Sequence, residues 1–163
     1  MSKSEIYIGI PNGVVLCVDQ MPHNGALRAR LFHGYHDGPI EIASYLEMLE
    51  VMERLFDELH FPWPGVKDRS FMDEDQKAGT AGRKEKERIM SDKEMLTQRG
   101  DLGTFIIRVQ QRQGATWQGR VTWADQNKTI HFRSALELIK LIESGIEAGH
   151  PELVEEESPN WDE

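Results

Sequence analysis

The sequence contains a single cysteine, Cys17, among its 163 residues. One cysteine excludes an intramolecular disulfide and is typical of a protein that works in a reducing compartment. No apolar run approaches the roughly 20 residues that a membrane-spanning helix needs, and the N-terminal residues include no apolar segment long enough for a signal peptide. These absences predict a cytoplasmic protein with no membrane partner.

Residues that would support catalysis or metal binding are not gathered in a recognisable pattern. His33, His36 and Asp37 have a spacing that could begin a metal site, but no compact set of histidines and cysteines completes it. Cys17 has no histidine in register to act as its base, and no glycine-rich turn leads from a strand into a helix to hold phosphates. The sequence therefore predicts no enzymatic activity, no metal and no cofactor.

The clearest pattern in the chain covers residues 104–142 and predicts three strands followed by one helix. Apolar and polar residues alternate from Thr104 to Arg112, again from Trp117 to Trp123, and in a third short stretch, which is the period of half-buried strands. Ser134 and Glu137 then form a capping box, and apolar residues at helical spacing follow it. A small sheet with one apolar face needs such a helix as its cover.

The same pattern occurs earlier in the chain at a constant offset of ninety residues, with one extra residue in the first hairpin. Ser44 and Glu47 form a second capping box, and the strand phases upstream of it match. We therefore predict an α+β fold of two β-β-β-α repeats, each a small antiparallel sheet covered by one amphipathic helix. Leu49 and Leu138, one from each predicted helix, are expected to be fully buried.

Composition divides the chain into four parts. Residues 1–65 hold the first β-β-β-α unit with an extra N-terminal strand, and residues 101–150 hold the second unit. Residues 66–100 are polar and charged, so they cannot bury enough apolar surface to order themselves alone. We predict a flexible linker there that is helical in part. Residues 151–163 form an acidic tail with no basic residue.

The formal net charge of −9 is unevenly distributed along the chain. Most of the excess acidity lies in the tail and on the outer face of the first predicted helix, whereas the second unit is nearly neutral. We predict that this helix face binds a partner through its carboxylates, which are Glu47, Glu50, Glu53, Asp57 and Glu58.

The second unit carries basic residues in one strand phase. The pattern places them, with His131 and several glutamines, on the sheet face away from the helix; they are Arg108, Arg112, Arg120 and Arg133. Such a face could meet a phosphate backbone or an acidic protein surface. The alternatives are that it packs against the first unit or is simply solvated. Trp117 and Trp123 have the opposite phase, which favours a place in the core over stacking on bases.

Three segments resemble an uncharacterised family of small proteins from clostridial and related gut anaerobes. They read FIIRVQQRQGATWQGRVTW, IHFRSALELIKLIESGI and LEMLEVMERLFDELHFPWPGVKDRSF. The resemblance implies a bacterial or mobile-element protein and carries no assigned activity.

Taken together, these patterns predict a non-catalytic, acidic protein-interaction module. A sharper form of this hypothesis is an inhibitor of a bacterial defence system, of the anti-CRISPR type, whose acidic helix face occupies a nucleic-acid-binding surface of its target. The alternative is a nucleic-acid-binding regulator that uses the Arg/Gln-rich sheet face. The overall negative charge argues against this alternative, because it repels phosphates.

Overall fold

The computed structural model describes residues 8–21, 26–62, 71, 87–112 and 116–153. Within them the chain forms six strands, three α-helices and one short 3₁₀ helix. In chain order these elements are β1 (Val14–Gln20), β2 (Arg28–His33), β3 (Ile40–Ile42), α1 (Tyr45–Leu59), α2 (Asp92–Leu96), β4 (Gly103–Gln111), β5 (Gln118–Trp123), β6 (Lys128–Phe132), α3 (Ala135–Gly149) and η3 (Pro151–Leu153).

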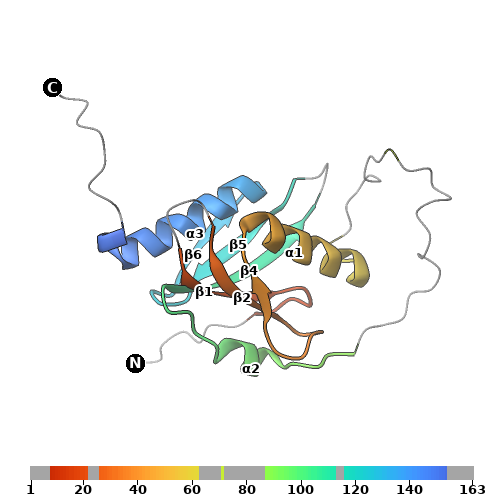
Figure 1. Ribbon diagram of the computed structural model, residues 1–163. Helices are drawn as coiled ribbons and strands as arrows, with labels where there is room; N and C mark the ends of the chain where they lie inside the picture. Colours follow the sequence, from red (N-terminus) through yellow and green to blue (C-terminus); the bar gives the residue numbers. More distant parts are fainter. Residues whose placement is uncertain (1–7, 22–25, 63–70, 72–86, 113–115, 154–163) are drawn as a thin grey trace, which may run out of the picture.

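All six strands belong to one antiparallel sheet with the order β3-β2-β1-β4-β5-β6 (Figure 1). The predicted α+β class is confirmed, but the expectation of a separate small sheet for each half is corrected. β1 and β4 pair at the centre, with Val15 opposite Ile106, and so join the two strand triplets into one sheet. The reason is visible in both strands, which carry buried apolar side chains on both faces, as central strands do.

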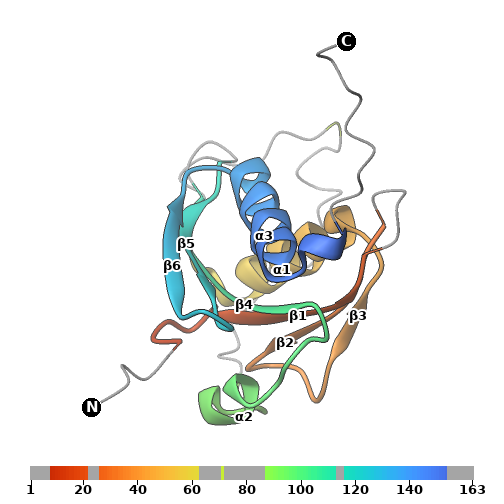
Figure 2. The same cartoon turned by 90° about the vertical axis from the view of Figure 1, so that its left-hand side faces the viewer.

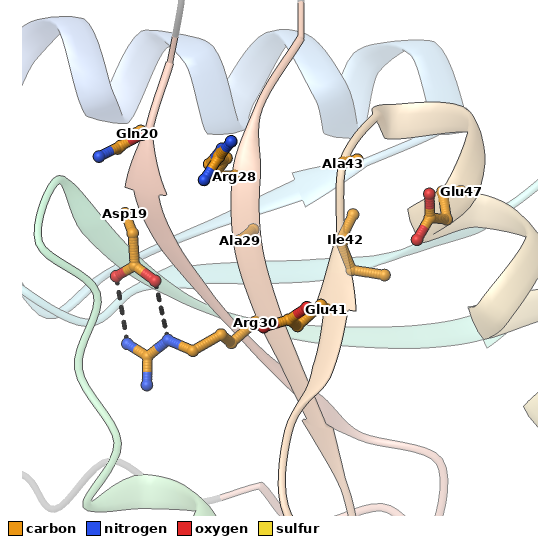
Figure 3. Close-up of a pocket in the computed structure, with 9 residues that line it drawn as sticks. All are labelled: Asp19, Gln20, Arg28, Ala29, Arg30, Glu41, Ile42, Ala43 and Glu47. Atoms are coloured by element: carbon orange, nitrogen blue, oxygen red, sulfur yellow. Dashed lines mark hydrogen bonds and ion pairs between the residues drawn. The ribbon is translucent and has the colours of Figure 1, made fainter.

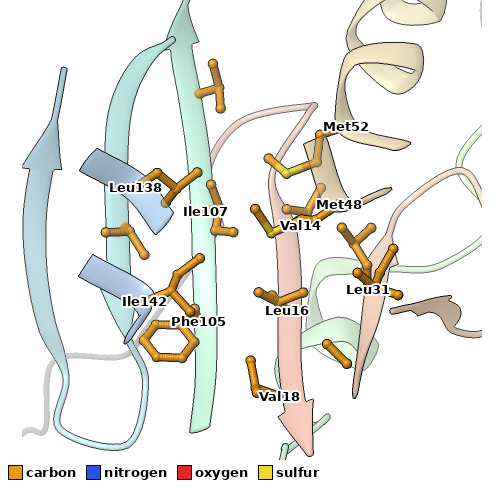
Figure 4. Packing of buried hydrophobic residues seen from close by; sticks show 14 of the residues in the cluster. Val14, Leu16, Val18, Leu31, Met48, Met52, Phe105, Ile107, Leu138 and Ile142 are labelled. Atoms are coloured by element: carbon orange, nitrogen blue, oxygen red, sulfur yellow. The ribbon is translucent and has the colours of Figure 1, made fainter. Parts of the chain in front are cut away.

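Helices α1 and α3 cover one face of this sheet, and α2 lies against the other face (Figure 2). The main core lies beneath α1 and α3, where Met48 and Met52 of α1 and Leu138 and Ile142 of α3 pack against the strands (Figure 4). The central strands supply residues such as Leu16 to this core. Each helix presents one apolar stripe to the sheet, as the periodicity predicted.

The two long helices begin in the same way. The Ser44 hydroxyl accepts a hydrogen bond from the Glu47 N–H at 3.1 Å, and the Ser134 hydroxyl accepts one from the Glu137 N–H at 3.0 Å. The backbone angles agree closely, with φ −158° and ψ 160° at Ser44 and φ −157° and ψ 161° at Ser134. Both predicted N-caps are therefore confirmed.

Burial along the two helices also agrees. From residues 41–58 and from residues 131–148, the sequence of buried, half-buried and exposed positions is the same at every step. Leu138 is fully buried, as predicted. Leu49 is only half-buried, because its neighbour Met48 occupies the fully buried position of α1. The expectation for Leu49 was therefore wrong by one residue of helix phase.

The second face of the sheet is partly covered by the end of the predicted linker. Met90 and the α2 residue Met95 pack there on Val15, Cys17 and other strand residues. This segment gains its order from contact with the sheet, which its own composition could not supply. Most of the predicted linker and most of the acidic tail lie outside the described residues. Half of the predicted N-terminal strand, residues 5–7, also lies outside them, and residues 8–10, its described half, form no strand, which corrects that part of the prediction.

Candidate anion-binding site

Among the described residues, those that cover the second sheet face stop short of β5 and β6, and we call the region of β4, β5 and β6 beyond them the open half-face. Its side chains are polar, and most of them are exposed or half-buried. They are Arg108, Gln110, Gln118, Arg120, Thr129 and His131. Thr122 also lies on this face and is buried.

Three basic residues form a line across the open half-face, and we call Arg108, Arg120 and His131 the basic row. Arg108 of β4 lies opposite Arg120 of β5, and Arg120 lies opposite His131 of β6. Residues directly opposite each other in antiparallel strands have Cβ atoms only about 4.5–5.5 Å apart, and like charges in such positions repel. The row therefore concentrates positive charge on a surface that gains no stability from it.

Arg108 is held in a fixed orientation. Its Nε donates to the Ile8 carbonyl at 2.8 Å, and its Nη1 donates to the Thr122 hydroxyl at 2.8 Å. The Thr122 and Thr129 hydroxyls are in turn 2.8 Å apart and share a hydrogen bond. These contacts orient the guanidinium group at the wall of a cavity of about 240 Å³, which Arg120, Gln110, Thr129 and residues 8–10 also line.

Arg120 has no partner within the part of the chain that the structure describes. Its side chain is exposed and makes no hydrogen bond or ion pair with a described residue, and the same holds for His131. No described carboxylate therefore neutralises these two members of the row. A charged group without an internal partner remains available to a ligand.

The corresponding positions in the first half of the sheet show the opposite arrangement, and we call Cys17, Arg30 and Glu41 the counterpart row. They lie opposite one another in β1, β2 and β3, as the basic row does in β4, β5 and β6. Asp19 adds a second carboxylate: it accepts from Arg30 Nε at 2.8 Å and from Arg30 Nη2 at 3.1 Å (Figure 3).

The charge of the two rows therefore differs at every position but one. Arg30 corresponds to Arg120, but the residue that corresponds to Asp19 is the neutral Gln110. Hydrogen bonding to Arg30 lowers the pKa of Asp19, and that carboxylate in turn raises the pKa of Arg30. The first half thus pairs Arg30 with a carboxylate, whereas no described carboxylate pairs with Arg120 in the second half.

Arg112 does not lie on the open half-face, which corrects the prediction from strand phase. A β-bulge between Val109 and Gln111 shifts the alternation by one residue, so the Arg112 side chain turns toward α1 and is only 2% exposed. Gly119 opposite the bulge was the available signal, because glycine inside a strand often marks a close backbone approach. A Cβ at Gly119 would lie 1.8 Å from the Arg108 carbonyl oxygen.

Arg112 instead engages part of the predicted acidic face of α1. Its Nη1 lies 3.0 Å from a carboxylate oxygen of Glu53 and 2.9 Å from one of Asp57, and its Nε donates to the Pro62 carbonyl at 2.7 Å. The Trp117 indole N–H donates to the other oxygen of Glu53 at 3.0 Å. Two of the five predicted binding carboxylates therefore hold α1 to the end of β4.

The remaining predicted binding residues are not brought together into one site. Glu50 and Glu58 are exposed on α1, whereas Glu47 is half-buried in the first turn of this helix and lines a cavity near Arg30 (Figure 3). Arg133 is exposed in the turn between β6 and α3, and it does not line the cavity beside the basic row.

Two side chains that sequence reasoning assigned to the interior are found there. Trp117 is 6% exposed, and Trp123 packs against the same core.

Cys17 is buried on the α2 side of the sheet, and burial, the largest cause, raises the pKa of its thiol to about 11. A nucleophilic cysteine needs a lowered pKa and access to solvent, so Cys17 is not suited to catalysis.

Comparison with known proteins adds no relative. No family model matches the sequence, and neither curated proteins nor solved structures gave a match. Among the described residues, no cluster of three or more His, Cys, Asp or Glu side chains could hold a metal ion. In the same part of the chain, no helix is both long enough and apolar enough to cross a membrane.

Proposed function

We propose that the chain is a non-catalytic interaction module that holds a negatively charged partner on the open half-face. One observation carries this proposal: Arg120 and His131 lack any described carboxylate partner, although the corresponding Arg30 is paired with Asp19. Like charges directly opposite each other, as in Arg108 and Arg120, destabilise a sheet. A function that needs positive charge at this position explains why the row persists.

We further propose that the two halves are copies of one β-β-β-α unit, of which the second acquired the binding surface. The matched caps and burial patterns support this. So does the pairing of β1 with β4, in which Val14 lies opposite Ile107 and Leu16 lies opposite Phe105. With the extra residue of the first hairpin, Phe105 corresponds to Val14 and Ile107 to Leu16, so each pair is the image of the other, as a two-fold axis requires.

The β-bulges support the same relationship. One lies between Val18 and Gln20 in β1, and the other lies between Val109 and Gln111 in β4. These positions correspond under the same alignment of the two halves. Bulges are conserved within protein families, so two bulges at matched positions favour a shared origin of the two halves.

A protein with an acidic surface fits the open half-face better than a nucleic acid does. Proteins that bind single strands usually stack bases on aromatic side chains, but no described Phe, Tyr or Trp side chain belongs to this half-face, and both tryptophans of β5 and its approach face the core. The net charge of −9 also repels a polynucleotide. Nucleic-acid binding through phosphate contacts alone remains the second candidate, because arginine forks suit phosphates.

The hypothesis of a defence-system inhibitor that acts through the acidic face of α1 remains a prediction. Glu53 and Asp57 are engaged with Arg112, so these two carboxylates serve the contact between α1 and the end of β4. The resemblance to proteins of clostridial anaerobes likewise remains a prediction and serves here to choose a test lysate.

The proposal is tested by capturing partners from the lysate of a clostridial anaerobe on three forms of the immobilised full chain. These are the wild type, Arg120→Glu and, as a matched control on the helix side of the sheet, Arg54→Glu, which changes an exposed arginine of α1. We expect a protein that binds the wild type and the control but not Arg120→Glu, with or without nuclease. Loss of capture after nuclease treatment would favour the nucleic-acid candidate, and equal capture by all three forms would refute both.

A further inference from the structure

We infer that the outer edge of β6 binds an extended segment of the protein partner in which acidic and apolar residues alternate. This inference rests on the proposed function and deepens it by naming the form and the pattern of the segment that is bound. β6 lies at one end of the sheet and, among the described residues, pairs only with β5 (Figure 2). An edge strand carries a row of backbone N–H and C=O groups that can pair with another chain.

The two edges of the sheet differ in length and in cover. β3, the edge strand of the first half, has only 3 residues, and its Ile40 is half-buried against the main core. β6 has 5 residues, four of which are exposed, and Ile130, which corresponds to Ile40, is 50% exposed. Proteins commonly protect sheet edges by shortening or covering them. The first half does so, whereas β6 remains available for pairing within the part of the chain that the structure describes.

An apolar cavity lies beside Ile130 on the helix side of β6, and we call it the edge cavity. Its volume is about 200 Å³, and its walls come from the strands and from the second half of α3. The apolar residues of these walls include Phe105, Val121, Trp123 and Leu141. A cavity of about 150 Å³ with apolar walls is large enough for benzene. The edge cavity therefore has room for one leucine or phenylalanine side chain of a partner.

The first half has larger side chains at the corresponding helix positions. Gly145 and Ala148 of α3 line the edge cavity, and their counterparts in α1 are Leu55, which is 2% exposed in the main core, and Glu58. A Cβ at Gly145 would lie 2.8 Å from Phe105 Cε1, so a leucine does not fit there unless that ring moves. The smaller α3 residues therefore give the second half an apolar recess directly beside its edge strand.

The two faces of β6 determine the pattern of the bound segment. Successive side chains of a strand point to opposite faces, so a strand paired with β6 turns every second side chain toward the edge cavity and the others toward the open half-face. On the cavity side Ile130 offers apolar contact. On the other side lie His131 and, one strand further, Arg120, neither of which has a described carboxylate partner. Apolar residues suit the first side, and acidic residues suit the second.

A second copy of this chain is a poorer occupant of the edge than a different, acidic protein. Two β6 strands paired in antiparallel fashion would place both basic rows on the same face of one continuous sheet. The sequence of β6, Lys-Thr-Ile-His-Phe, contains no acidic residue that could offset this charge. Because like charges on neighbouring strands repel, the basic row favours an acidic segment of another protein.

The inference is tested with a capped peptide of about seven residues, close to the length of an ordinary strand, in which glutamate and leucine alternate. NMR of the full chain follows its binding. We expect saturable shifts of the β6 amides and of the Trp123 indole Nε1–H, and slower hydrogen exchange of alternate β6 amides, because main-chain pairing protects them. A peptide with the same residues but grouped leucines, and one of alternating lysine and leucine, should each bind about tenfold more weakly or worse. Equal binding by either control, or no added protection of β6, would overturn the inference.

The backbone pairing is tested separately with two N-methylated forms of the alternating peptide. In a paired strand, alternate N–H groups point toward the neighbouring strand and the others point away from it. Methylation of one alternating set should therefore abolish binding, and methylation of the other set should leave most of it. Equal effects of the two sets would show that the peptide backbone does not pair with β6.

Two variants of the chain test the edge and the cavity. Ile130→Thr keeps a β-branched residue but removes apolar contact, and Ala148→Glu introduces the residue type of the first half at the cavity wall. Each should weaken binding of the alternating peptide about tenfold or more. Lys140→Gln changes the net charge by the same amount as Ala148→Glu, at an exposed α3 position away from the cavity, and should leave binding unchanged. Unchanged binding by Ile130→Thr or by Ala148→Glu, with thermal melts that show folded protein, would overturn the inference.

The same variants separate this inference from the proposed function. If lysate capture is lost in Arg120→Glu but retained in Ile130→Thr, the inference is refuted and the proposed function stands. If the alternating peptide binds as expected but capture does not depend on Arg120, the proposed function is refuted. A dimer of the free chain that sedimentation detects, and that Ile130→Thr abolishes, would show that a second copy occupies the edge and would also overturn the inference.

Discussion

Arg120 lies directly opposite Arg108 in the neighbouring strand, and Arg120 has no ion-pair partner among the described residues. Like charges in this position destabilise a sheet, and opposite charges stabilise it by about 0.2–1 kcal/mol. The basic row therefore lowers the stability of the sheet while it provides positive charge for a partner. Substitutions in this row should raise the free energy of unfolding and weaken binding of the partner.

The first prediction concerns stability in the absence of a ligand. Arg120→Gln should raise the free energy of unfolding by a few tenths of a kcal/mol, and Arg120→Glu by up to about 1 kcal/mol, because glutamate would face Arg108 and His131. Urea unfolding at low ionic strength measures both, and added salt should shrink the gain. A loss of stability in Arg120→Glu would show that the row does not repel itself.

A second prediction concerns the buried Arg112. Arg112→Ala should reduce the free energy of unfolding by about 2–4 kcal/mol, because it removes the packing beside Phe56 and leaves Glu53 Oε1 and the Pro62 carbonyl without their donor. Asp57→Asn should cost less than about 1 kcal/mol, since the Asp57 side chain is 56% exposed and its charge is well hydrated. Equal losses in the two variants, measured by urea unfolding, would contradict this.

The third prediction uses the matched helix caps. Ser44→Ala and Ser134→Ala should each cost about 0.5–2 kcal/mol, because each leaves a backbone N–H of the first turn without its acceptor. The losses should add in the double variant to within about 0.5 kcal/mol, since the two caps share no partner. Aspartate at either position should restore most of the stability. A cap whose removal costs nothing would show that the two helix starts are not equivalent.

A fourth prediction compares two leucines. Leu138→Ala should cost about 2–5 kcal/mol, because the side chain is fully buried in the main core. Leu49→Ala should cost about half as much, since Leu49 packs at the edge of that core. Thermal or urea unfolding of the two variants gives the ratio, and a larger loss at Leu49 would mean that α1 is rotated from the position described.

The fifth prediction follows from the Cys17 thiol, whose pKa is raised to about 11 by burial. The folded state then binds the thiol proton more tightly than the unfolded state, so the contribution to stability is complete below pH 9 and falls as the pH rises from 9 toward 11. Cys17→Ala should remove this part of the alkaline loss. At pH 8 the native thiol should react with a disulfide reagent at least about 100-fold more slowly than in urea; equal rates would show that the thiol is accessible.

Sequence periodicity predicted most of the secondary structure, and it did so where a single face is buried. The strands around Val109 and Val121 and the caps at Ser44 and Ser134 follow directly from local patterns. What it missed is long-range pairing. β1 and β4 are apolar on both faces, which marks them as central strands. The sequence of either strand does not indicate that the other is its neighbour in the sheet.

The candidate site was predicted in part, and its limits have a definite cause. Arg108 and Arg120 lie on the predicted face because regular alternation holds up to Val109. The bulge after Val109 moves the Arg112 side chain to the helix side of the sheet. Counting alternate residues along the sequence does not reveal such an inserted residue. The lack of a described carboxylate partner for Arg120 became evident only by comparison with Arg30, because the contact between Asp19 and Arg30 depends on the fold.

The central pairing of β1 with β4 has a kinetic consequence. Within each half, neighbouring strands and the helix that follows them are close in sequence, whereas Val15 and Ile106 are about ninety residues apart. Long-range contacts slow folding because the entropy of closing the loop is lost before the contact forms. Each half is then expected to form its own hairpins first. The rate of folding is set by the later pairing of β1 with β4. Until β1 and β4 pair, the apolar side chains and the unpaired edges of both strands are exposed to solvent. Aggregation with other copies of the chain is therefore most favoured before this pairing forms.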